Sequence, residues 1–485
     1  MTVEVAMNVA EAPVAEVVPS QNEPKVVEDC EDLKEAKNDE SADTGVEKAS
    51  SYREESNFSS DLKEFEKKAL SDLKAKLEEA FAANSLFIKE EAKKPKAKPA
   101  AKEEEGKVEE AKPEAEGEDK AEKEPEEGAA ECKEEKKEQK DVFLWGVPLV
   151  PCKSHEGTDV VLLKFLRARE FKVNEAFEML KKTLLWRRES NIDSLLEEDL
   201  GIDLSSAFFM DGFDREGHPV CYNIFGAFAN PELHERTFGS EESRKLVLRW
   251  RVQLMEKGIE KLDLRPGGIT SILQISDLKN SPTPSKKELK AYMNQAHALL
   301  QDNYPELVAR NIVINAPFWY YALNAILSPF MTQRTKNKFV VARPSRITET
   351  LLKYLPAEEI PLHYGGFKRE NDFEFSKEDG EVVEAVVKAA SIHTIEIPAE
   401  QAGTTLIWDI VVLGWDVNYK EEFTCSDEGS YSIIVQKEKK LNHSDAPIRN
   451  TFKANEPGKV VLTINNSTGR KKKVLYRSKV KKAAC

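Results

Sequence analysis

Residues 304–342 read YPELVARNIVINAPFWYYALNAILSPFMTQRTKNKFVVA, and this stretch decides the fold. A short apolar strand stops at Asn315, and aromatic and aliphatic residues then occupy nearly every side of a predicted helix over 319–331. Such a helix is either buried or faces something apolar that is not protein. Pro329 interrupts it, and the basic segment 332–338 follows at once. The pattern fits an ordinary core helix with a solvated end, or a movable lid between acyl chains and an anionic membrane.

The segments around this stretch alternate between short apolar strands and helices. Strands are predicted at 219–224, 269–275, 312–314 and 338–342, and helices at 241–260, 286–301 and 319–331. Strands separated by helices are typical of an α/β domain with a parallel or mixed sheet. Farther upstream, residues 158–190 carry apolar side chains at helical spacing. We therefore expect a helical lobe over 141–200 and an α/β domain over 201–368.

Beyond residue 371 the apolar period changes from helical to two. Strands are predicted at 391–397, 405–412, 431–436, 458–464 and 473–477, with turn signals such as Asn465-Asn466-Ser-Thr-Gly469 between them. About 100 residues of short, alternating strands predict an all-β sandwich over 371–485.

The N-terminal 140 residues differ from the rest in charge. Residues 1–140 contain 40 acidic and 24 basic side chains, whereas residues 141–485 contain 47 and 48. The formal charge of -15 therefore belongs to an acidic tail. Its parts at 1–56 and 92–140 have few large apolar groups, which predicts disorder.

One amphipathic helix is predicted inside this tail, over about 60–83. Its apolar residues recur every three to five positions, from Leu62 to Phe81, and Ser60-Asp61 can cap its start. Two interpretations stay open: the helix packs on the folded body, or it docks on a partner or a membrane.

Several function classes are disfavoured by the sequence. It contains no phosphate-binding loop, dinucleotide fingerprint, HExxH or GxSxG motif, so we expect neither an enzyme nor a resident cofactor. The six cysteines and seven histidines lack metal-ligand spacing, which fits reduced thiols in a cytosolic protein. No apolar run approaches the roughly 20 residues of a membrane span, and the first residues lack the pattern of a signal peptide. Membrane binding would then be peripheral.

Three groups of motifs carry a resemblance to a known family. They are LKFLRAREF (163–171) with Trp186-Arg-Arg188, then Tyr304-Pro-Glu306 with Asn315-Ala-Pro-Phe318 and Lys338, and finally LKYLPAEEIPLHYGGF (352–367). At this spacing, residues 141–368 resemble the CRAL-TRIO lipid-binding family. The predicted sandwich resembles a GOLD domain, with Trp408 and Trp415 on or beside its strands. An acidic tail, a CRAL-TRIO domain and a GOLD domain in this order are similar to the patellins of plants, which are implicated in vesicle trafficking, cell-plate formation and phosphoinositide binding.

The resemblance implies roles for individual residues. It implies that a lipid headgroup contacts Glu306, Lys338, Thr335 and Arg169. It further implies that the predicted lid gates an acyl pocket through Phe318, Leu323, Ile326, Leu327 and Phe330. Two positions depart from the phosphatidylcholine site of the family, where Ile272 and Gln274 stand in place of hydroxyl residues. Two further departures, Leu307 and Glu170, replace basic residues near the headgroup.

A second membrane contact is predicted at the basic C-terminal segment 470–483, which contains no acid. Its surface residues would be Lys471, Lys472, Lys473, Arg477 and Lys479. Each basic residue near an anionic leaflet contributes roughly 1 kcal/mol, so several together would bind usefully. A solvated strand and tail is the alternative.

The sequence thus predicts a phosphatidylinositol- or phosphoinositide-binding protein and leaves open whether it also transfers the lipid between membranes. It would act peripherally in membrane trafficking, at the plasma membrane or the cell plate during cytokinesis. The expected partners are phosphoinositides, an anionic membrane surface and trafficking proteins that contact the GOLD domain, with no nucleic acid. The alternative is a trafficking adaptor that binds partners through the GOLD domain and has a vestigial lipid site.

Overall fold

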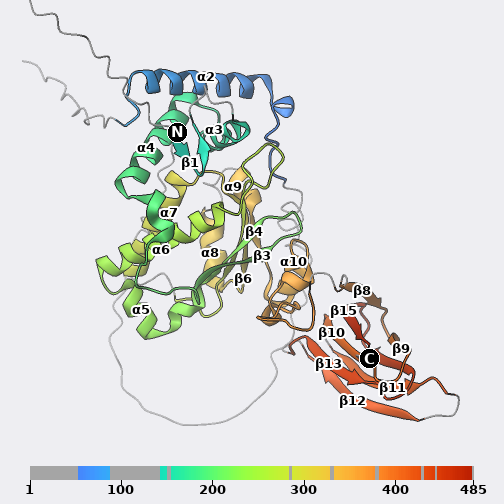
Figure 1. Ribbon diagram of the computed structural model, residues 1–485. Coiled ribbons are helices and arrows are strands. Elements are labelled where there is room, and N and C mark those ends of the chain that lie inside the picture. Colours follow the sequence, from blue (N-terminus) through green and yellow to red (C-terminus); the bar gives the residue numbers. More distant parts are fainter. Residues whose placement is uncertain are drawn as a thin grey trace, which may run out of the picture.

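The computed structural model describes residues 53–87, 142–149, 155–282, 287–327, 333–376, 379, 382–414, 416–427, 431–442 and 445–482. They form a helical lobe, a central α/β domain and a β-sandwich, arranged in that order from one end of the molecule to the other (Figure 1). The predicted fold class is confirmed in all three parts. Most of the predicted disordered tail lies outside the described residues. No helix in the described ranges is long and apolar enough to cross a membrane.

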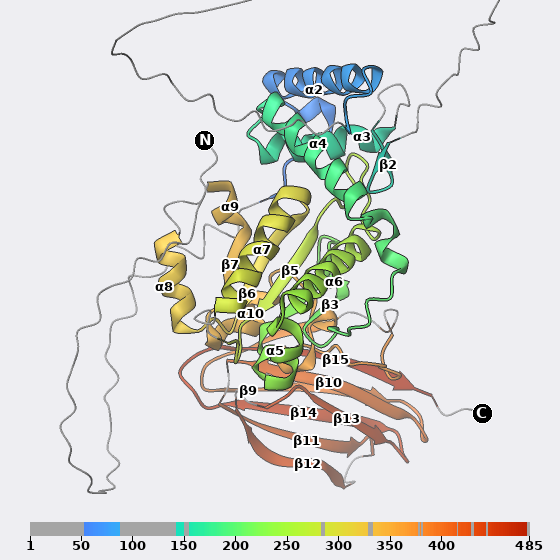
Figure 2. The same ribbon diagram turned by 90° about the vertical axis from the view of Figure 1, so that its left-hand side faces the viewer.

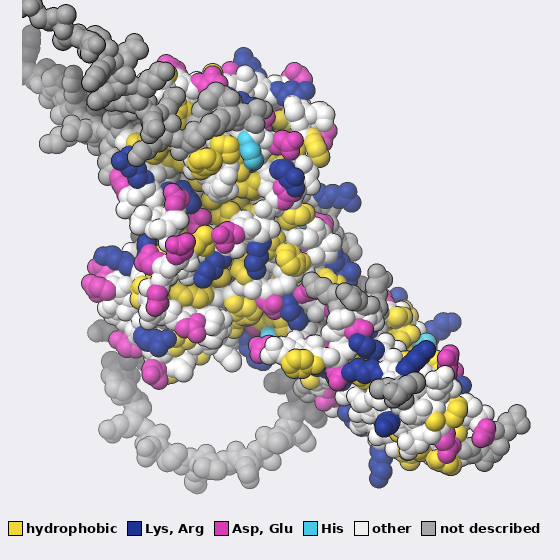
Figure 3. Space-filling model, in the orientation of Figure 1, with side chains coloured by type: hydrophobic (Ala, Val, Ile, Leu, Met, Phe, Trp, Pro, Cys, Tyr) yellow, Lys and Arg dark blue, Asp and Glu magenta, His cyan; other side chains and the backbone are white. Residues whose placement is uncertain are grey.

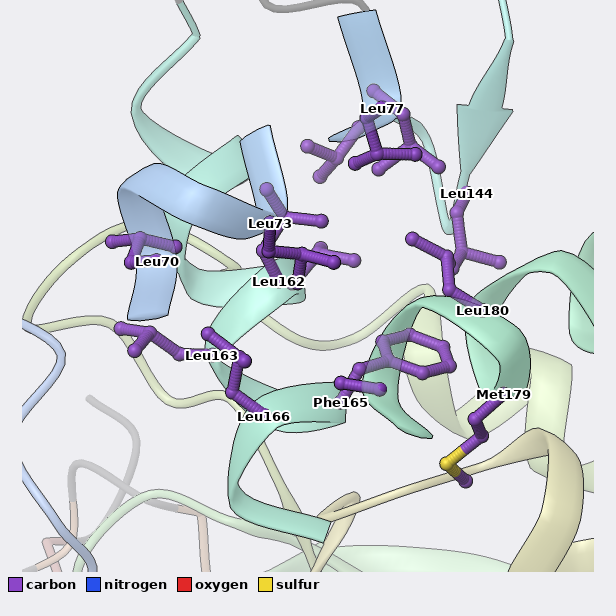
Figure 4. Packing of buried hydrophobic residues seen from close by; sticks show 14 of the residues in the cluster. Leu70, Leu73, Leu77, Leu144, Leu162, Leu163, Phe165, Leu166, Met179 and Leu180 are labelled. Atoms are coloured by element: carbon purple, nitrogen blue, oxygen red, sulfur yellow. The ribbon is translucent and has the colours of Figure 1, made fainter. Parts of the chain in front are cut away.

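The helical lobe consists of α2 (Glu64–Ala82), α3 (Glu156–Ala168) and α4 (Val173–Glu189), with a small hairpin of β1 (Phe143–Leu144) and β2 (Val147–Pro148). Leucines of α2 face leucines of α3 in the interior of the lobe (Figure 4). Leu73 and Leu77 are both fully buried there. Burying each such side chain contributes roughly 1.5–3 kcal/mol. The interpretation of a helix packed on the folded body is therefore confirmed.

The start of this helix differs from the prediction. Ser60 and Asp61 do not cap α2, because they lie in the preceding 3-10 turn η1 (Ser59–Asp61), where Ser56 Oγ and Ser60 Oγ donate to the Asp61 carboxylate at 2.6 and 2.9 Å. The helix begins three residues later, and Glu66 Oε2 accepts from the backbone N–H of Lys63 at 2.9 Å. A glutamate that reaches back to the N-cap amide is one half of a capping box.

The α/β domain is built on a five-stranded sheet in the order β3-β4-β5-β6-β7. The strands are β3 (Phe208–Phe213), β4 (Pro219–Ile224), β5 (Ile272–Asp277), β6 (Val308–Ile314) and β7 (Phe339–Val341). β3 and β4 are antiparallel and the other pairs are parallel, so the sheet is mixed as predicted. β3 was not predicted.

Both faces of this sheet are covered. The helices on one face are α5 (Pro231–Phe238), α6 (Glu241–Ile259) and α7 (Lys287–Asn303), and their apolar side chains share a core with β3 and β5. On the other face lie α10 (Ile347–Leu351) and the short turns up to Tyr364. The 3-10 turns of the domain are η2 (Ile192–Glu197), η3 (Phe225–Ala229), η5 (Pro344–Arg346), η6 (Ala357–Glu359) and η7 (Leu362–Tyr364).

Two helices follow β6 where one was predicted over 319–331. α8 (Phe318–Leu327) contains the apolar run, and α9 (Gln333–Lys338) contains the basic segment. They lie next to each other along one side of the domain, beyond α7 (Figure 2). Residues 328–332, which include Pro329, lie outside the described residues.

The C-terminal domain is a sandwich of two four-stranded antiparallel sheets, in the orders β13-β10-β15-β8 and β12-β11-β14-β9. The strands are β8 (Val383–Val387), β9 (Ser391–Ala399), β10 (Thr405–Leu413), β11 (Val417–Cys425), β12 (Ser432–Leu441), β13 (Ile448–Lys453), β14 (Gly458–Asn466) and β15 (Lys472–Lys481). Trp408 of β10 is fully buried between the sheets. Its indole N–H donates to Glu421, a buried acid that also accepts from the Tyr419 hydroxyl at 2.8 Å. Trp415 lies outside the described residues.

Candidate functional site

The candidate site is built around Glu306, in the turn between α7 and β6. Tyr304 anchors this turn, because its buried ring donates from the hydroxyl to Glu256 Oε1 at 2.5 Å. Glu306 has a φ of +55°, a left-handed conformation that is uncommon outside glycine and asparagine. Such strain costs on the order of 1–3 kcal/mol and is concentrated at functional sites.

Two cations from α9 converge on the Glu306 carboxylate. Lys338 Nζ donates to Glu306 Oε2 at 2.6 Å and to the Val308 carbonyl at 3.0 Å. Arg334, one turn earlier on the same helix, places Nη2 3.2 Å from the same carboxylate oxygen. Burial favours the protonated acid, yet the charges of Lys338 and Arg334 lower the pKa of Glu306 below its ordinary value. The structure therefore brings the predicted pair Glu306 and Lys338 together.

Two further cations reach this site from α3. Lys164 Nζ donates to the Glu306 carbonyl at 2.8 Å. Its pKa falls to about 8 because burial disfavours the cation more than the acids Glu54 and Glu306 favour it. Arg167, three residues later and almost fully buried, lies on the same face of the helix. We refer to Lys164, Arg167, Arg334 and Lys338 as the cationic cluster.

Three members of this cluster are absent from the sequence-based prediction. A signal was available for each of them. Lys164 and Arg167 stand three residues apart in the otherwise apolar stretch 160–168, and Arg334 stands four residues before Lys338. Charged residues at these spacings share one helix face, so both pairs could have been expected to point to one place.

The other two predicted headgroup residues are Arg169, which lies away from Glu306, and Thr335. Arg169 ends α3 and lines a separate groove of about 660 Å³, together with residues of α4 and the end of α7. It lies two positions after Arg167, and successive helical residues turn by about 100°, so the two side chains leave α3 in different directions. The side chain of Thr335 lies outside the described residues.

Other residues from the recognised motifs hold the framework. Asp277 at the end of β5 accepts from Asn315 Nδ2 at 2.8 Å and from the Tyr364 hydroxyl at 2.6 Å. These bonds tie the ends of two neighbouring parallel strands to the 3-10 turn η7. Asn315 itself has a φ of +52°, which asparagine adopts more readily than other non-glycine residues. These three side chains are thus structural.

The predicted gate can be followed only in part. Phe318 at the start of α8 is 88 % exposed, and Tyr321 on the next turn is 38 % exposed. The side chains of Leu323, Ile326 and Leu327, and all of Phe330, lie outside the described residues. An exposed phenylalanine at the end of an apolar helix is compatible with the lid interpretation, which stays a prediction.

The predicted basic surface needs correction. Lys472 and Arg477 are both buried, on opposite faces of β15. Arg477 lies where the sandwich meets the α/β domain, with its guanidinium 5.5 Å from the ring centroid of Phe367. Lys472 Nζ donates to the Gly414 carbonyl, and Arg477 Nε donates to Asp409 Oδ2 at 2.8 Å. These two residues were wrongly assigned to a membrane surface.

The remaining basic residues of this segment are more accessible. Lys473 pairs with Glu384 and Lys479 with Asp379, both at 2.6 Å, while Lys471 is exposed. On the face shown in Figure 3, Lys and Arg side chains are interspersed with Asp and Glu. In the part of the chain that the structure describes, no group of three or more His, Cys, Asp or Glu side chains could hold a metal ion.

Comparisons with known proteins agree with this architecture. Residues 129–182 match the CRAL/TRIO N-terminal domain, residues 204–366 the CRAL/TRIO domain, and residues 388–473 the Patellin-1-like C-terminal GOLD domain. Patellin-4 of Arabidopsis thaliana is 51 % identical over 96 % of this chain and 95 % of its own length. Patellin-3 of the same plant is 48 % identical, over 70 % of each chain. The Sec14 cytosolic factor of Schizosaccharomyces pombe is 29 % identical over 43 % of this chain and 74 % of its own.

Proposed function

Because this chain belongs to the patellin family, we propose that it binds one phosphatidylinositol or phosphoinositide and acts peripherally at membranes. Membership of the patellin family makes this chain a lipid-binding protein that acts in membrane trafficking. The proposal adds the class of headgroup and the place, which is the plasma membrane or the cell plate of a dividing plant cell. In this proposal the chain has no catalytic role, and the phospholipid is its ligand.

The observation that carries the proposal is the convergence of Glu306, Lys338 and Arg334 on one partly exposed point. The Glu306 side chain is 17 % exposed and the Arg334 side chain 28 %. A carboxylate accepts hydrogen bonds from inositol hydroxyls, while ammonium and guanidinium groups pair with phosphate oxygens. The site therefore offers both chemistries that an inositol phospholipid headgroup requires.

The position of α8 supports a role in covering the acyl chains. α8 and α9 are consecutive, so the apolar helix and two cations of the site belong to one short segment. A lipid held here would place its headgroup against α9 and its chains against α8. The exposed Phe318 would touch the membrane interface, where aromatic residues are favoured.

Sedimentation with liposomes tests the proposal on the full chain. The probe is a phosphatidylcholine vesicle containing a few mole per cent of phosphatidylinositol 4-phosphate. Glu306→Ala with Lys338→Ala should weaken binding by about tenfold or more, since charge-assisted hydrogen bonds contribute roughly 1.5–3 kcal/mol each. Binding within about twofold of the unmodified chain would overturn the assignment.

A matched control pair lies on α6. Glu241 and Lys245 form an ion pair of 2.7 Å, but their side chains are 65 % and 69 % exposed. Replacing both by alanine removes the same two charges and should leave lipid binding unchanged.

An adaptor function through the sandwich is the second candidate, and β12 favours it. This strand forms one edge of its sheet, so one side of its backbone is unpaired, and Ile434 is 60 % exposed on it. Exposed edge strands are templates for pairing with another chain. Loss of liposome binding on removal of 370–485, together with no effect of the Glu306 and Lys338 substitutions, would favour this function.

A further inference from the structure

An acidic segment of the tail lies against the candidate site. We call residues 53–58 the acidic strap; they precede the 3-10 turn η1 and α2. Glu55 Oε2 lies 2.9 Å from Arg167 Nε and 3.3 Å from Arg334 Nη2. Arg334 thus stands between Glu55 on the strap and Glu306 in the site. Disorder was predicted over 1–56. The structure corrects this for residues 53–56, because Glu54 and Glu55 form ion pairs with side chains of the folded body.

The neighbouring strap residue Glu54 is bound still more firmly. It accepts from Ser271 Oγ at 2.7 Å and lies 3.2 Å from His218 Nε2. Burial acts to raise its pKa, but the hydrogen bonds to His218 and Ser271 and the charge of Lys164 lower the pKa of Glu54 to about 2. Glu54 is therefore ionised throughout the physiological range.

The strap also accepts hydrogen bonds from Arg167, through its backbone and through a polar side chain. The Ser56 carbonyl accepts from Arg167 Nη2 and Asn57 Oδ1 accepts from Arg167 Nη1, both at 2.6 Å. Phe58 then packs on Gly267, where an added methyl group would lie 2.7 Å from the phenyl ring. The strap is thus seated by side-chain, backbone and ring contacts together.

The charge balance shows what the strap does for the site. The cationic cluster carries four positive charges, and Glu306 is the acid that the folded body directs at it. Buried cations need partners, because desolvation is otherwise uncompensated. Glu54 and Glu55 of the strap supply two of the nearby carboxylates, beside Glu306 and Glu66 of α2.

The guanidinium groups have capacity for a different anion. Arg167 Nε and Arg334 Nε are buried atoms that make no hydrogen bond within the described residues, although Glu55 lies close enough to Arg167 for an ion pair. All three nitrogen atoms of Arg167 face the strap, so departure of the strap would free the whole guanidinium fork, whereas Arg334 Nε has no hydrogen-bond partner among the described residues even with the strap in place. A phosphate group has three terminal oxygens in a geometry that suits two such forks.

We propose that Arg167 and Arg334 form a subsite for a phosphate monoester on the lipid headgroup, and that Glu55 of the acidic strap occupies this subsite until the lipid displaces it. This inference rests on the proposed function and adds to it a ligand class, a monophosphorylated or more highly phosphorylated inositol lipid. The strap is joined to α2, which packs on the helical lobe, so it competes as a tethered group at high effective concentration. Bound ligand and seated strap exclude each other.

The central test compares Glu55→Gln with the unmodified full chain on vesicles containing phosphatidylinositol 4-phosphate. Glu55→Gln should tighten binding by about fivefold to tenfold, because the competing carboxylate is weakened. On vesicles with unphosphorylated phosphatidylinositol the gain should be less than about twofold. The matched control is Glu64→Gln, which removes the same charge from α2 at a side chain that is 90 % exposed and pairs with Lys67. If the two variants have equal effects, or if Glu55→Gln has none, the proposal that the strap competes with the lipid is rejected.

A second measurement follows the strap directly in the unmodified chain. Amide hydrogen exchange in 53–58 should accelerate when phosphatidylinositol 4-phosphate vesicles are added, and inorganic phosphate at the same phosphate concentration should have a smaller effect. Equal acceleration by both probes would reassign the subsite to free phosphate. Unchanged exchange while Glu306→Ala with Lys338→Ala abolishes lipid binding would reject the strap and leave the proposed function standing. If that double variant binds normally, the proposed function fails instead.

Discussion

Two clusters of buried charge can be compared in this molecule. One is the cationic cluster, whose acids are Glu306 and the strap residues. The other lies where the α/β domain meets the sandwich, and we call it the arginine cluster: Arg369, Arg449 and Arg477 around Asp372 and Asp409. Asp409 is completely buried and lies 2.6–2.9 Å from all three arginines.

The clusters differ in where their acids come from. In the arginine cluster, Asp409 is on β10 and Asp372 is on the connection just before the sandwich. Despite partial burial, bonds from Arg449 and two backbone amides lower the pKa of Asp372 well below its usual range. Asp409 cannot leave without disrupting β10, and Asp372 is held by Arg449, Arg477 and two backbone amides. In the cationic cluster, Glu54 and Glu55 are 33 % and 48 % exposed and sit on a segment that ends the tail. Ion pairs therefore hold the junction of the two domains permanently in the arginine cluster. In the cationic cluster they hold the strap over the candidate site in a way that a ligand can reverse.

Asp409→Asn should give the largest effect of the substitutions considered. It keeps the shape of the side chain but leaves the buried Arg477 and the partly buried Arg369 and Arg449 with one acid, and breaking a buried pair costs about 3–5 kcal/mol. Hydrogen exchange of the β10 and β15 amides should report this loss of local stability. The control is Asp416→Asn, whose side chain is 57 % exposed and pairs with Lys440 at 3.1 Å; it should change stability by less than about 1 kcal/mol. Similar effects at both positions would contradict the permanent role of the arginine cluster.

Leu73→Ala should have the next largest effect, because it weakens the attachment of the strap. Leu73 is fully buried where α2 packs on the other helices of the lobe, and truncating such a leucine costs about 3 kcal/mol. Exchange in α2 and in 53–58 should rise together, while the sandwich should be unaffected. Phe65→Ala on the same helix is the control, since Phe65 is 55 % exposed and should cost much less. A rise in α2 alone would show that the strap is held independently of α2.

Much of the fold follows from apolar periodicity, as the prediction of α2 and of β4 to β7 shows. The exceptions have physical reasons. β3 contains Asp211-Gly212, a turn signal that here forms an irregularity in the pairing with β4 between Met210 and Phe213, so the strand continues past it. β11 contains a Lys-Glu-Glu run, yet Glu421 points inward and is satisfied by Trp408 and Tyr419. Local pattern cannot anticipate a buried acid that depends on partners from other strands, here Trp408 of β10 and Asn450 of β13.

The site was predictable to a smaller extent. Glu306 and Lys338 are 32 residues apart in sequence, and only the motif resemblance joined them. The strap was missed because its composition predicts disorder, while its partners lie more than 100 residues away, as the 110 residues between Asn57 and Arg167 illustrate. Contacts of that range depend on how the lobe and sheet are assembled, which charge composition does not encode.

The third prediction concerns pH and His218, which anchors the strap. Burial lowers the pKa of His218, but Asp214 at 2.9 Å and Glu54 at 3.2 Å outweigh it and raise the pKa to about 9. Between pH 6.5 and 9 the folded state holds a proton that the unfolded state has lost, so stability falls as pH rises. Glu216, 4.0 Å away, acts in the same direction.

The expected loss between pH 6.5 and 8 is about 1–2 kcal/mol after allowance for screening. Above pH 8 the lowered pKa of Lys164 works the other way, because the folded state then releases a proton that the unfolded state keeps until about pH 10.5. The protection of the 53–58 amides against hydrogen exchange, measured as a function of pH, should fall over this range. The substitution His218→Gln should remove this fall. An unchanged slope in His218→Gln would mean that another group anchors the strap.

The smallest effect is expected at the basic end of the sandwich, where an exposed lysine and a lysine in an ion pair can be compared two residues apart. Lys471 is exposed just before β15, whereas Lys473 pairs with Glu384 at 2.6 Å. A basic residue near an anionic leaflet contributes about 1 kcal/mol, so Lys471→Ala should weaken binding to phosphatidylserine vesicles by about fivefold. Lys473→Ala should have less effect, because Glu384 already offsets its charge. If Lys473→Ala weakens binding at least as much as Lys471→Ala, the ion pair with Glu384 does not limit the contact of Lys473 with membranes.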